Sequence, residues 1–228
     1  MAVIGVCEDD PGLRRVLSRG LGNGGHEVVL AHNGSEAVRL FGPDSEVTVI
    51  VMDIGLPDAD GRDVCQALKA SGQQAPVLFL TALDGTHEKL AGFSAGGDDY
   101  VTKPFELKEV LARLDVLARR NPQTPTPGYD FTLDPLAHSV RTATGESMLT
   151  PTEFRMLAAI GARPGEVVRR RAVVAAGWPD GALVSENTID SFMRRIRSKL
   201  TDAGSAVQIE TVRGIGFRIQ AGTPSCGT

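Results

Sequence analysis

The 228-residue chain contains few cysteines, the three being Cys7, Cys65 and Cys226. An odd number without metal-type spacing argues against a disulfide scaffold or a zinc site, so we expect them to be reduced and structural or incidental. No apolar run approaches the length of a membrane span, and the first residues lack the basic, apolar and small-residue order of a signal peptide. We therefore expect a cytoplasmic protein of one or two domains that does not bind membranes.

The formal net charge of −4 hides a difference between the two halves of the chain. Residues 1–121 hold 18 acidic against 12 basic side chains, whereas residues 122–228 hold 10 against 12. An acidic first half suits a divalent metal and protein partners. The mildly basic second half leaves nucleic acid open as a partner without establishing it.

Residues 47–52, VTVIVM, carry no charge, and Asp53 follows them directly. Such a run is typical of a strand that is buried on both faces. Ligands of open parallel sheets bind beyond the carboxyl ends of the strands, so Asp53 would face a binding site, and we expect it to be chemically modified. The alternative is that Asp53 caps the next helix or begins a turn.

Strand-like and helix-like patterns alternate through residues 1–120. Apolar runs at residues 3–6, 28–31, 47–52, 75–80 and 100–101 predict strands. Helical patterns follow them, beginning at Pro11 and at residues 34–41, 61–69, 86–95 and 106–120. Asp10 is expected to cap the first helix, because Pro fits the first helical position. The alternation predicts an α/β fold with a flavodoxin-like, doubly wound, five-stranded parallel sheet.

Polar side chains that could take part in a reaction follow four of these strands. Because a parallel sheet brings the carboxyl ends of its strands to one edge, we expect these side chains to gather there: Glu8, Asp9, Asp53, Thr81 and Lys103. The acid pair alone is a weak metal motif, and Lys103 alone would be a surface lysine. The whole set suits phosphoryl transfer to Asp53, with a hard cation on the acids and Lys103 and Thr81 binding phosphoryl oxygens.

Residues 1–120 resemble the receiver domain of response regulators, through the motifs GVCEDD, VMDIGLP, FLTA and DDYVTKPF. The resemblance implies that Asp53 accepts phosphate from a sensor histidine kinase. It implies that Glu8, Asp9 and the backbone carbonyl of Gly55 hold Mg2+, with Mn2+ as the alternative. It also implies a switch formed by Thr81 and Tyr100, and a cis bond before Pro104.

The resemblance argues against an enzyme. A phosphatase with Asp53 as nucleophile would typically carry a second Asp two residues on, where this chain has Gly55. A second alternative is a regulator that binds DNA constitutively. Such a regulator would be expected to lack the acids or Lys103, whereas this chain has them all. Since Gly55 and Leu83 cannot orient a water molecule, we expect only slow self-dephosphorylation.

The last receiver helix carries mixed charges on one face, which in general is simply a solvated surface. In the OmpR/PhoB subfamily of response regulators, which the whole chain resembles, this face forms a dimer on phosphorylation. The resemblance implies the corresponding residues here: Lys89, Asp98, Asp99, Glu109, Arg113 and Arg120. Pairs such as Lys89 with Glu109 and Asp99 with Arg113 are implied. Ser94 and Asp115 depart from a further pair of the subfamily.

Residues 121–128, NPQTPTPG, predict a stiff linker, and residues 129–220 a second, α+β domain. Short strands are expected first, then a helix that Thr150 and Glu153 begin with a capping box. Residues 186–200 predict an amphipathic helix, and residues 208–219 a hairpin. Residues 221–228 form a tail that carries no usable signal. Amphipathicity with a few arginines usually marks only a surface helix.

The second domain resembles the winged helix-turn-helix effector domain of the OmpR/PhoB subfamily of two-component regulators, through LTPTEF, ENTIDSFMRRIRSKL and IETVRGIGFRI. The resemblance implies DNA contacts by Arg194, Arg195, Arg197, Thr211 and Arg213. It places Trp178 in a loop presented to RNA polymerase, while Asn187 and Phe192 depart from common residues. The whole chain is thus expected to be a transcription factor switched by phosphorylation and bound to tandem half-sites in promoters.

Overall fold

The computed structural model describes residues 1–82, 97–118, 129–178 and 184–220. A five-stranded parallel sheet in the order β2-β1-β3-β4-β5 forms the N-terminal half. Its strands are β1 (Val3–Cys7), β2 (Glu27–Ala31), β3 (Val49–Asp53), β4 (Val77–Thr81) and β5 (Asp99–Thr102). The order reverses between β1 and β3, so the predicted flavodoxin-like sheet is confirmed.

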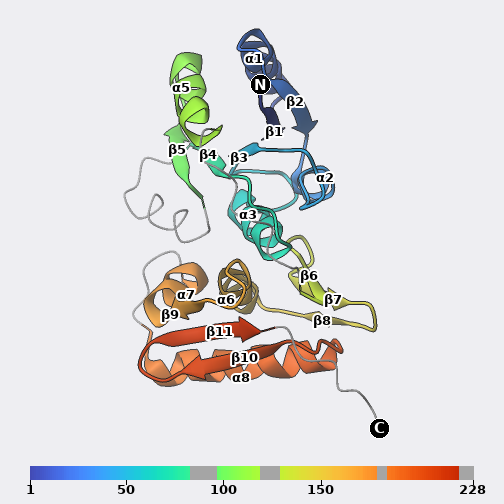
Figure 1. Ribbon diagram of the computed structural model, residues 1–228, viewed down its shortest axis with the longest axis vertical. Helices are drawn as coiled ribbons and strands as arrows, with labels where there is room; N and C mark the ends of the chain where they lie inside the picture. Colours follow the sequence, from blue (N-terminus) through green and yellow to red (C-terminus); the bar gives the residue numbers. More distant parts are fainter. Residues whose placement is uncertain (83–96, 119–128, 179–183, 221–228) are drawn as a thin grey trace.

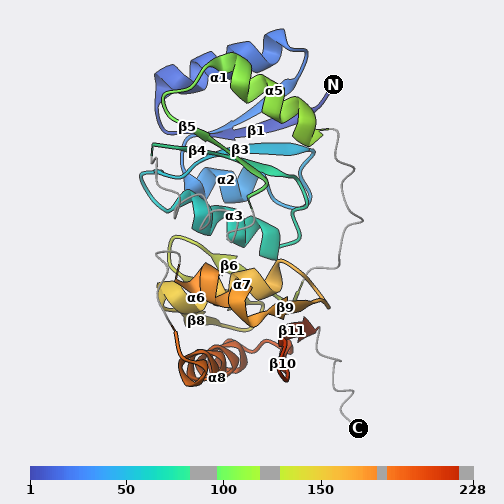
Figure 2. The ribbon, with the colours of Figure 1, turned by 90° about the vertical axis from the view of Figure 1, so that its left-hand side faces the viewer.

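Helices cover both faces of this sheet, with α1 and α5 on one face and α2 and α3 on the other (Figure 2). Their bounds are Pro11–Asn23 for α1, Gly34–Leu40 for α2, Gly61–Ala70 for α3 and Leu107–Ala118 for α5. The helix expected at residues 86–95 lies outside the described residues. β3 and β4 are buried along their whole length, because they lie between the two helical layers.

Local sequence signals explain where these helices begin. The Asp10 side chain accepts from the backbone N–H of Leu13 and Pro11 opens α1, as predicted. Asn33 and Asp60 cap α2 and α3 in the same way. A Cβ atom at Gly20 would lie 2.5 Å from Leu107 Cδ2, so the absence of a side chain there allows α1 and α5 to pack closely.

Within residues 129–178 and 184–220, the C-terminal half contains two three-stranded antiparallel sheets and three helices. The strands β6 (Phe131–Asp134), β7 (Ser139–Thr142) and β8 (Glu146–Met148) precede α6 (Pro151–Gly161), β9 (Val167–Arg169), α7 (Arg170–Gly177) and α8 (Glu186–Asp202). The hairpin of β10 (Gln208–Val212) and β11 (Gly216–Gln220) follows, with β9 as its third strand. Thr150 and Glu153 form the predicted capping box, whereas β9 was not expected.

The two halves of the chain contact each other through α3, which packs against α6 and β6 (Figure 1). The core of the C-terminal half includes Ala67 and Ala70 of α3. In both views α8 lies at the end of the molecule that faces away from the parallel sheet (Figures 1 and 2). Among the described helices, none combines the length and the apolar character needed to cross a membrane.

Candidate functional site

Three carboxylates meet where β1 and β3 end. One ligand oxygen from each of Glu8, Asp9 and Asp53 lies within 4.8 Å of the others. Glu8 is 1% exposed and Asp53 is 6% exposed, whereas Asp9 is exposed. The parallel register therefore brings together acids that are separated by 44 positions in the chain, as the sequence indicated.

Lys103, which follows β5, lies between the two buried acids. Its Nζ atom is 2.7 Å from Glu8 Oε2 and 3.0 Å from Asp53 Oδ2. Burial alone would lower the pKa of Lys103, but the hydrogen bonds that it donates to Glu8 and Asp53 outweigh this and raise that pKa. The Lys103 ammonium therefore remains charged beside the acids. The expected cis bond before Pro104 is also confirmed.

The remaining predicted switch residues lie on the two strands beside this cluster. Thr81 ends β4 and is buried, and its carbonyl oxygen accepts from the backbone N–H of Lys103 at 2.6 Å. The ring of Tyr100 stacks on Phe79, with the centroids 5.9 Å apart, and burial raises the pKa of its hydroxyl. Thr81 therefore lies at the same carboxyl edge of the sheet as Asp53 and Lys103, whereas Tyr100 lies two residues before the end of β5.

Sequence reasoning missed Arg14, which lies in α1 directly behind the acid pair. Its Nη1 atom donates to the carbonyl oxygens of Glu8 at 2.6 Å and Asp9 at 2.7 Å. One guanidinium therefore fixes the backbone of both acids. Its position four residues after the helix cap Asp10 was the available signal, since that places it over the turn from which the helix begins.

Asp58 is a second residue that the sequence did not single out. Its carboxylate accepts from the backbone N–H of Gly34 at 2.7 Å and of Ser35 at 3.0 Å, at the first turn of α2. Burial alone would raise the pKa of Asp58, but these hydrogen bonds outweigh it and lower that pKa. The loop after Asp53 is thus fastened to a neighbouring helix.

The donor set of the acid cluster fits a hard divalent cation. It offers only carboxylate oxygens, which are the ligands that such ions prefer. Gly55 lies exposed two residues after Asp53, and a role for its carbonyl oxygen as a metal ligand stays a prediction. The backbone N–H of Gly55 also donates to Asp53 Oδ1 at 3.4 Å, which keeps this loop close to the acid. Receiver domains in general bind Mg2+ at such an acidic site.

The charged face predicted for dimerisation is described only in part. Arg113 Nη1 lies 2.9 Å from Asp99 Oδ2, and Arg113 Nη2 lies 2.9 Å from Glu109 Oε1, all within one chain. The Asp98 carboxylate accepts from the backbone N–H of Val77 at 3.0 Å. Lys89 and Arg120 lie outside the described residues. The pairing of Asp99 with Arg113 between two chains stays a prediction.

Helix α8 buries one stripe and exposes the other, as its periodicity predicted. Ile189, Met193, Ile196 and Leu200 are buried in the domain core. Arg194 and Arg195 are exposed on the opposite face. The guanidinium carbon of Arg195 lies 4.2 Å from the centroid of the Phe192 ring, and its Nε atom lies 3.6 Å from Glu153 Oε1. Phe192 therefore holds Arg195 on the exposed face.

Arg197 is directed toward the hairpin. It donates from Nε to the carbonyl oxygen of Ile209 at 2.8 Å and from Nη2 to Thr211 Oγ1 at 2.8 Å. Burial lowers the pKa of Arg197, which keeps its charge nonetheless. Arg213 is exposed at the hairpin tip, next to Gly214 with a φ of 73°. The phosphate contact predicted for Arg197 stays a prediction.

The aromatic ring of Phe192 also contacts Trp178, at 5.1 Å between centroids and nearly edge to face. Trp178 ends the described part of the loop between α7 and α8, whose residues 179–183 lie outside it. The loop that the resemblance assigns to RNA polymerase therefore begins at a side chain packed against α8.

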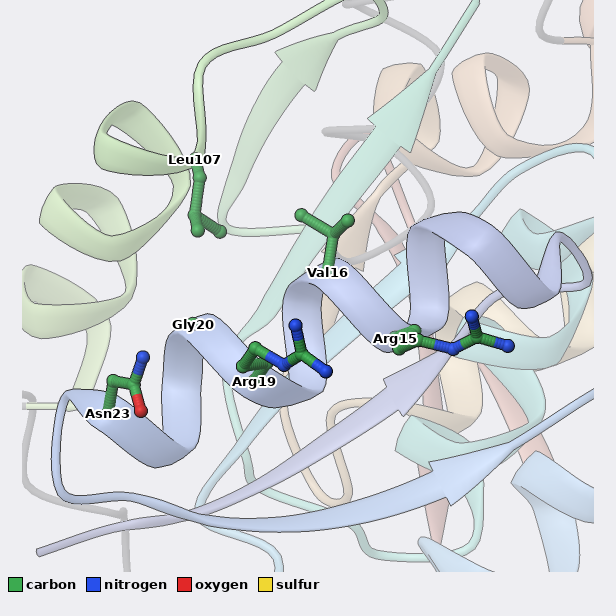
Figure 3. A pocket seen from close by; sticks show the side chains of 6 residues that line it. All are labelled: Arg15, Val16, Arg19, Gly20, Asn23 and Leu107. Carbon is green, nitrogen blue, oxygen red and sulfur yellow. The ribbon is translucent and has the colours of Figure 1, made fainter.

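A separate shallow cleft lies between α1 and α5 (Figure 3). Its lining includes Arg15, Val16, Arg19 and Leu107. None of the acid-cluster residues takes part in it, so it is not the site of the predicted chemistry.

Two family models match the chain, and together they cover both halves. The response regulator receiver domain matches residues 4–115, and the C-terminal domain of transcriptional regulatory proteins matches residues 145–219. A receiver fold with an acid cluster, joined to a winged-helix domain, defines a two-component response regulator. The chain belongs to this family, and specifically to its OmpR/PhoB type.

Among particular proteins, the chain is similar to the response regulator MprA of Mycobacterium sp. strain KMS. The two are 36% identical over 225 residues, which cover 96% of this chain and 97% of that protein. The receiver domain of HemR from Leptospira biflexa is 35% identical over 54% of this chain and 99% of that chain, with a TM-score of 0.51. The Francisella response regulator 1452 receiver domain is 32% identical over 53% of this chain and 98% of that chain, also with a TM-score of 0.51.

The family establishes the general role of the protein. It is a transcriptional regulator that phosphorylation switches, and a histidine kinase and DNA are the partners that its two domains imply.

Proposed function

We propose that Asp53 is the phosphoacceptor and that phosphate on it controls promoter binding by the second domain. The observation that carries this proposal is the position of Lys103, with its ammonium in contact with both buried acids at the edge of the sheet. A buried carboxylate beside a fixed cation is suited to attack a phosphoryl group, because the cation offsets the charge on the phosphoryl oxygens.

Each residue of the cluster has a distinct part in this transfer. A carboxylate oxygen of Asp53 attacks the phosphorus atom, and the bond from phosphorus to the kinase histidine nitrogen breaks. Lys103 stays charged and binds a phosphoryl oxygen, while the Thr81 hydroxyl binds another. Glu8, Asp9 and the carbonyl of Gly55 would hold Mg2+, or Mn2+ in its place. When bound, the ion would supply positive charge that stabilises the negative charge on the oxygens of the transferred phosphoryl group.

The phosphorylated form is proposed to dimerise through the face that contains Lys89, Asp98, Asp99, Glu109, Arg113 and Arg120. Two effector domains then occupy tandem half-sites about one helical turn apart, a spacing typical of paired helix-turn-helix domains. Arg194, Arg195 and Arg197 of α8 and Thr211 and Arg213 of the hairpin contact DNA, and the loop from Trp178 meets RNA polymerase. The protein works in the cytoplasm.

Labelling tests the phosphoacceptor. Acetyl phosphate with Mg2+ should label the protein, and Asp53→Asn should abolish the label. Asp9→Ala should lose most of it, because the metal would lose a ligand. An acid-stable, base-labile label that persists in Asp53→Asn would sink the assignment.

The lifetime of the phosphate label tests whether the chain catalyses hydrolysis of its own phosphorylated Asp53. Gly55 has no side chain and Leu83, which lies outside the described residues, has no polar group, so neither can orient an attacking water. The phosphorylated protein should keep its label for minutes to hours. Loss within seconds without a kinase would refute this.

Operator binding across a salt series tests the roles of two arginines. If Arg195 contacts a base edge, Arg195→Ala should cost about 1–3 kcal/mol and relax the preference at one position of each half-site. If Arg197 contacts a phosphate, Arg197→Ala should weaken all sequences alike and lower the salt slope by about 1. Equal weakening of cognate and random DNA by both changes would place specificity elsewhere, in the β10–β11 hairpin at Arg213.

A further inference from the structure

Arg195 of α8 lies against an aromatic ring and a buried carboxylate at the same time. Its guanidinium carbon is 4.2 Å from the centroid of the Phe192 ring, which stands about one helical turn earlier in α8. Its Nε atom is 3.6 Å from Oε1 of Glu153, whose side chain is 1% exposed. Neighbours from two helices, α8 and α6, therefore limit the directions that this half-exposed side chain can take.

Glu153 is itself fixed in position. Its Oε2 atom accepts from Lys199 Nζ at 2.6 Å and from the backbone N–H of Thr150 at 2.9 Å, while Oε1 faces Arg195. Among the described residues, neither Nη atom of Arg195 forms a hydrogen bond or an ion pair. Both terminal nitrogens are thus available for a base edge with two acceptors, such as the O6 and N7 atoms of guanine.

The ring of Phe192 is supported from a further element. Phe192 and Trp178 lie nearly perpendicular, at 88°, with their centroids 5.1 Å apart. Both side chains pack against the buried core of the effector domain. The backbone N–H of Trp178 donates to the carbonyl oxygen of Val174 at 2.9 Å, which attaches Trp178 to the end of α7. The Phe192 ring therefore has little freedom of its own, and it limits the freedom of Arg195 in turn.

Arg194 provides a contrast within the same helix. It is exposed, as Arg195 is. Within the part of the chain that the structure describes, the Arg194 guanidinium has no hydrogen bond, ion pair or ring contact. A mobile cation is sufficient for a phosphate, which carries no sequence information. Of these two neighbouring arginines, Arg195 is the one that the protein holds in a defined direction.

We propose that Phe192, supported by Trp178, is a positioning residue that prepares Arg195 for a base edge and so sets how strongly the chain distinguishes base pairs. This inference rests on the proposed role of Arg195 in reading a base. A side chain that is already held loses less freedom when it binds the correct base. At a wrong base Arg195 makes no such contact, so holding it brings no gain there. The aromatic support therefore increases discrimination between base pairs.

Trp178 thereby acquires a part in DNA reading. It follows α7 and acts on Arg195 only through the Phe192 ring. This role is separate from the contact with RNA polymerase that the resemblance implies for the same loop. A binding assay without polymerase isolates it.

The preference for one base pair tests this inference in the full chain with acetyl phosphate and Mg2+. We define the preference as the ratio of affinities for an operator selected by the parent and for the same operator with one base pair changed. Arg195→Ala should lower it about 5- to 150-fold at one position of each half-site. Phe192→Leu should lower it about 2- to 12-fold at that same position, which corresponds to the cost of ordering one side chain. Phe192→Tyr keeps the ring and should keep the preference.

A double-mutant cycle separates positioning from general support of the fold. In the Arg195→Ala background, Phe192→Leu should have no further effect on the preference. Trp178→Leu should lower the preference in the parent and have no effect in that background. Phe131→Leu is the matched control, because it makes the same chemical change in a ring that stacks on Tyr129 instead, with centroids 5.1 Å apart. Any unfolded fraction binds neither operator, so it cancels in the ratio.

Each failure has a distinct meaning. An unchanged preference in Phe192→Leu, at the position that Arg195→Ala relaxes, overturns the inference and leaves the proposed function intact. An equal loss with and without Arg195, or in Phe131→Leu, also overturns it, because the ring would then act on the whole domain. A loss in Phe192→Tyr as large as in Phe192→Leu contradicts a role of the ring, and an unchanged preference in Trp178→Leu contradicts its support by Trp178. If Arg195→Ala relaxes no position, the proposed role of Arg195 fails and this inference fails with it.

Discussion

Lys103→Met removes the ammonium of the acid cluster and keeps a side chain of similar length. The change deletes two charge-assisted contacts, of 2.7 Å to Glu8 and 3.0 Å to Asp53. Each such contact contributes about 1.5–3 kcal/mol, and removal of one partner from a buried set costs about 3–5 kcal/mol. Lys103 is 23% exposed, so we expect a cost near the lower limit, about 3 kcal/mol.

Scanning calorimetry of the full chain in EDTA measures this cost. The receiver transition should be the one that shifts when Mg2+ is added, and a loss of about 3 kcal/mol should lower its midpoint by about 10 °C or more. Mg2+ should raise the midpoint of the variant more than that of the parent, because the Lys103 charge no longer competes for the same carboxylates. Lys108→Met, an exposed lysine of α5, is the control.

Two results would refute this reasoning. One is an unchanged receiver midpoint in EDTA, which would mean that water already compensates the acids. The other is an equal Mg2+ response in the parent and Lys103→Met, which would mean that the ion binds elsewhere.

Three further changes test other parts of the chain. Burial alone would raise the pKa of Glu153, but Lys199 and the backbone N–H of Thr150 outweigh it and lower that pKa below its ordinary 4.5. The ionised Glu153 therefore stabilises the folded state above pH 4.5. This stabilisation is lost as the pH falls through the pKa that Glu153 has in the folded state. Glu153→Gln should therefore cost about 1–3 kcal/mol at pH 7 and little once the pH has fallen below the lowered pKa of Glu153, in urea unfolding followed by the single tryptophan. Arg113→Glu should keep phosphorylation but leave the protein monomeric in sedimentation, and a phosphorylated dimer of this variant would contradict the proposed face. Arg14→Ala should weaken Mg2+ binding about 10-fold in titration calorimetry, whereas an equal loss in Arg15→Ala would make the effect nonspecific.

The acid cluster could be predicted because each member stands directly after an apolar run. Once the five runs are recognised as parallel strands, their ends must share an edge, and Glu8, Asp53 and Lys103 follow from that alone. The helix starts were equally accessible, since Asp10 with Pro11 and Thr150 with Glu153 carry local capping signals. The core stripe of α8 followed from its periodicity.

Other features depend on contacts that have no local signal. The strand β9 has three residues, too few for an alternating pattern, and it exists because β11 pairs with it. The contact of α3 with the effector domain is indicated only weakly by the sequence. Asp63, Ala67 and Ala70 recur at helical spacing on a side of α3 that a helix covering a sheet would normally expose.

Arg197 connects the middle of α8 to β10, twelve and fourteen positions further along the chain. The helix and the hairpin are thereby held at one separation before any DNA is present, so little ordering remains to oppose binding. If α8 and the hairpin contact DNA as proposed, their fixed separation cannot adjust to a poorly spaced site. We then expect the DNA to bend or to change its groove width, so that base pairs that no side chain contacts influence affinity through their stiffness.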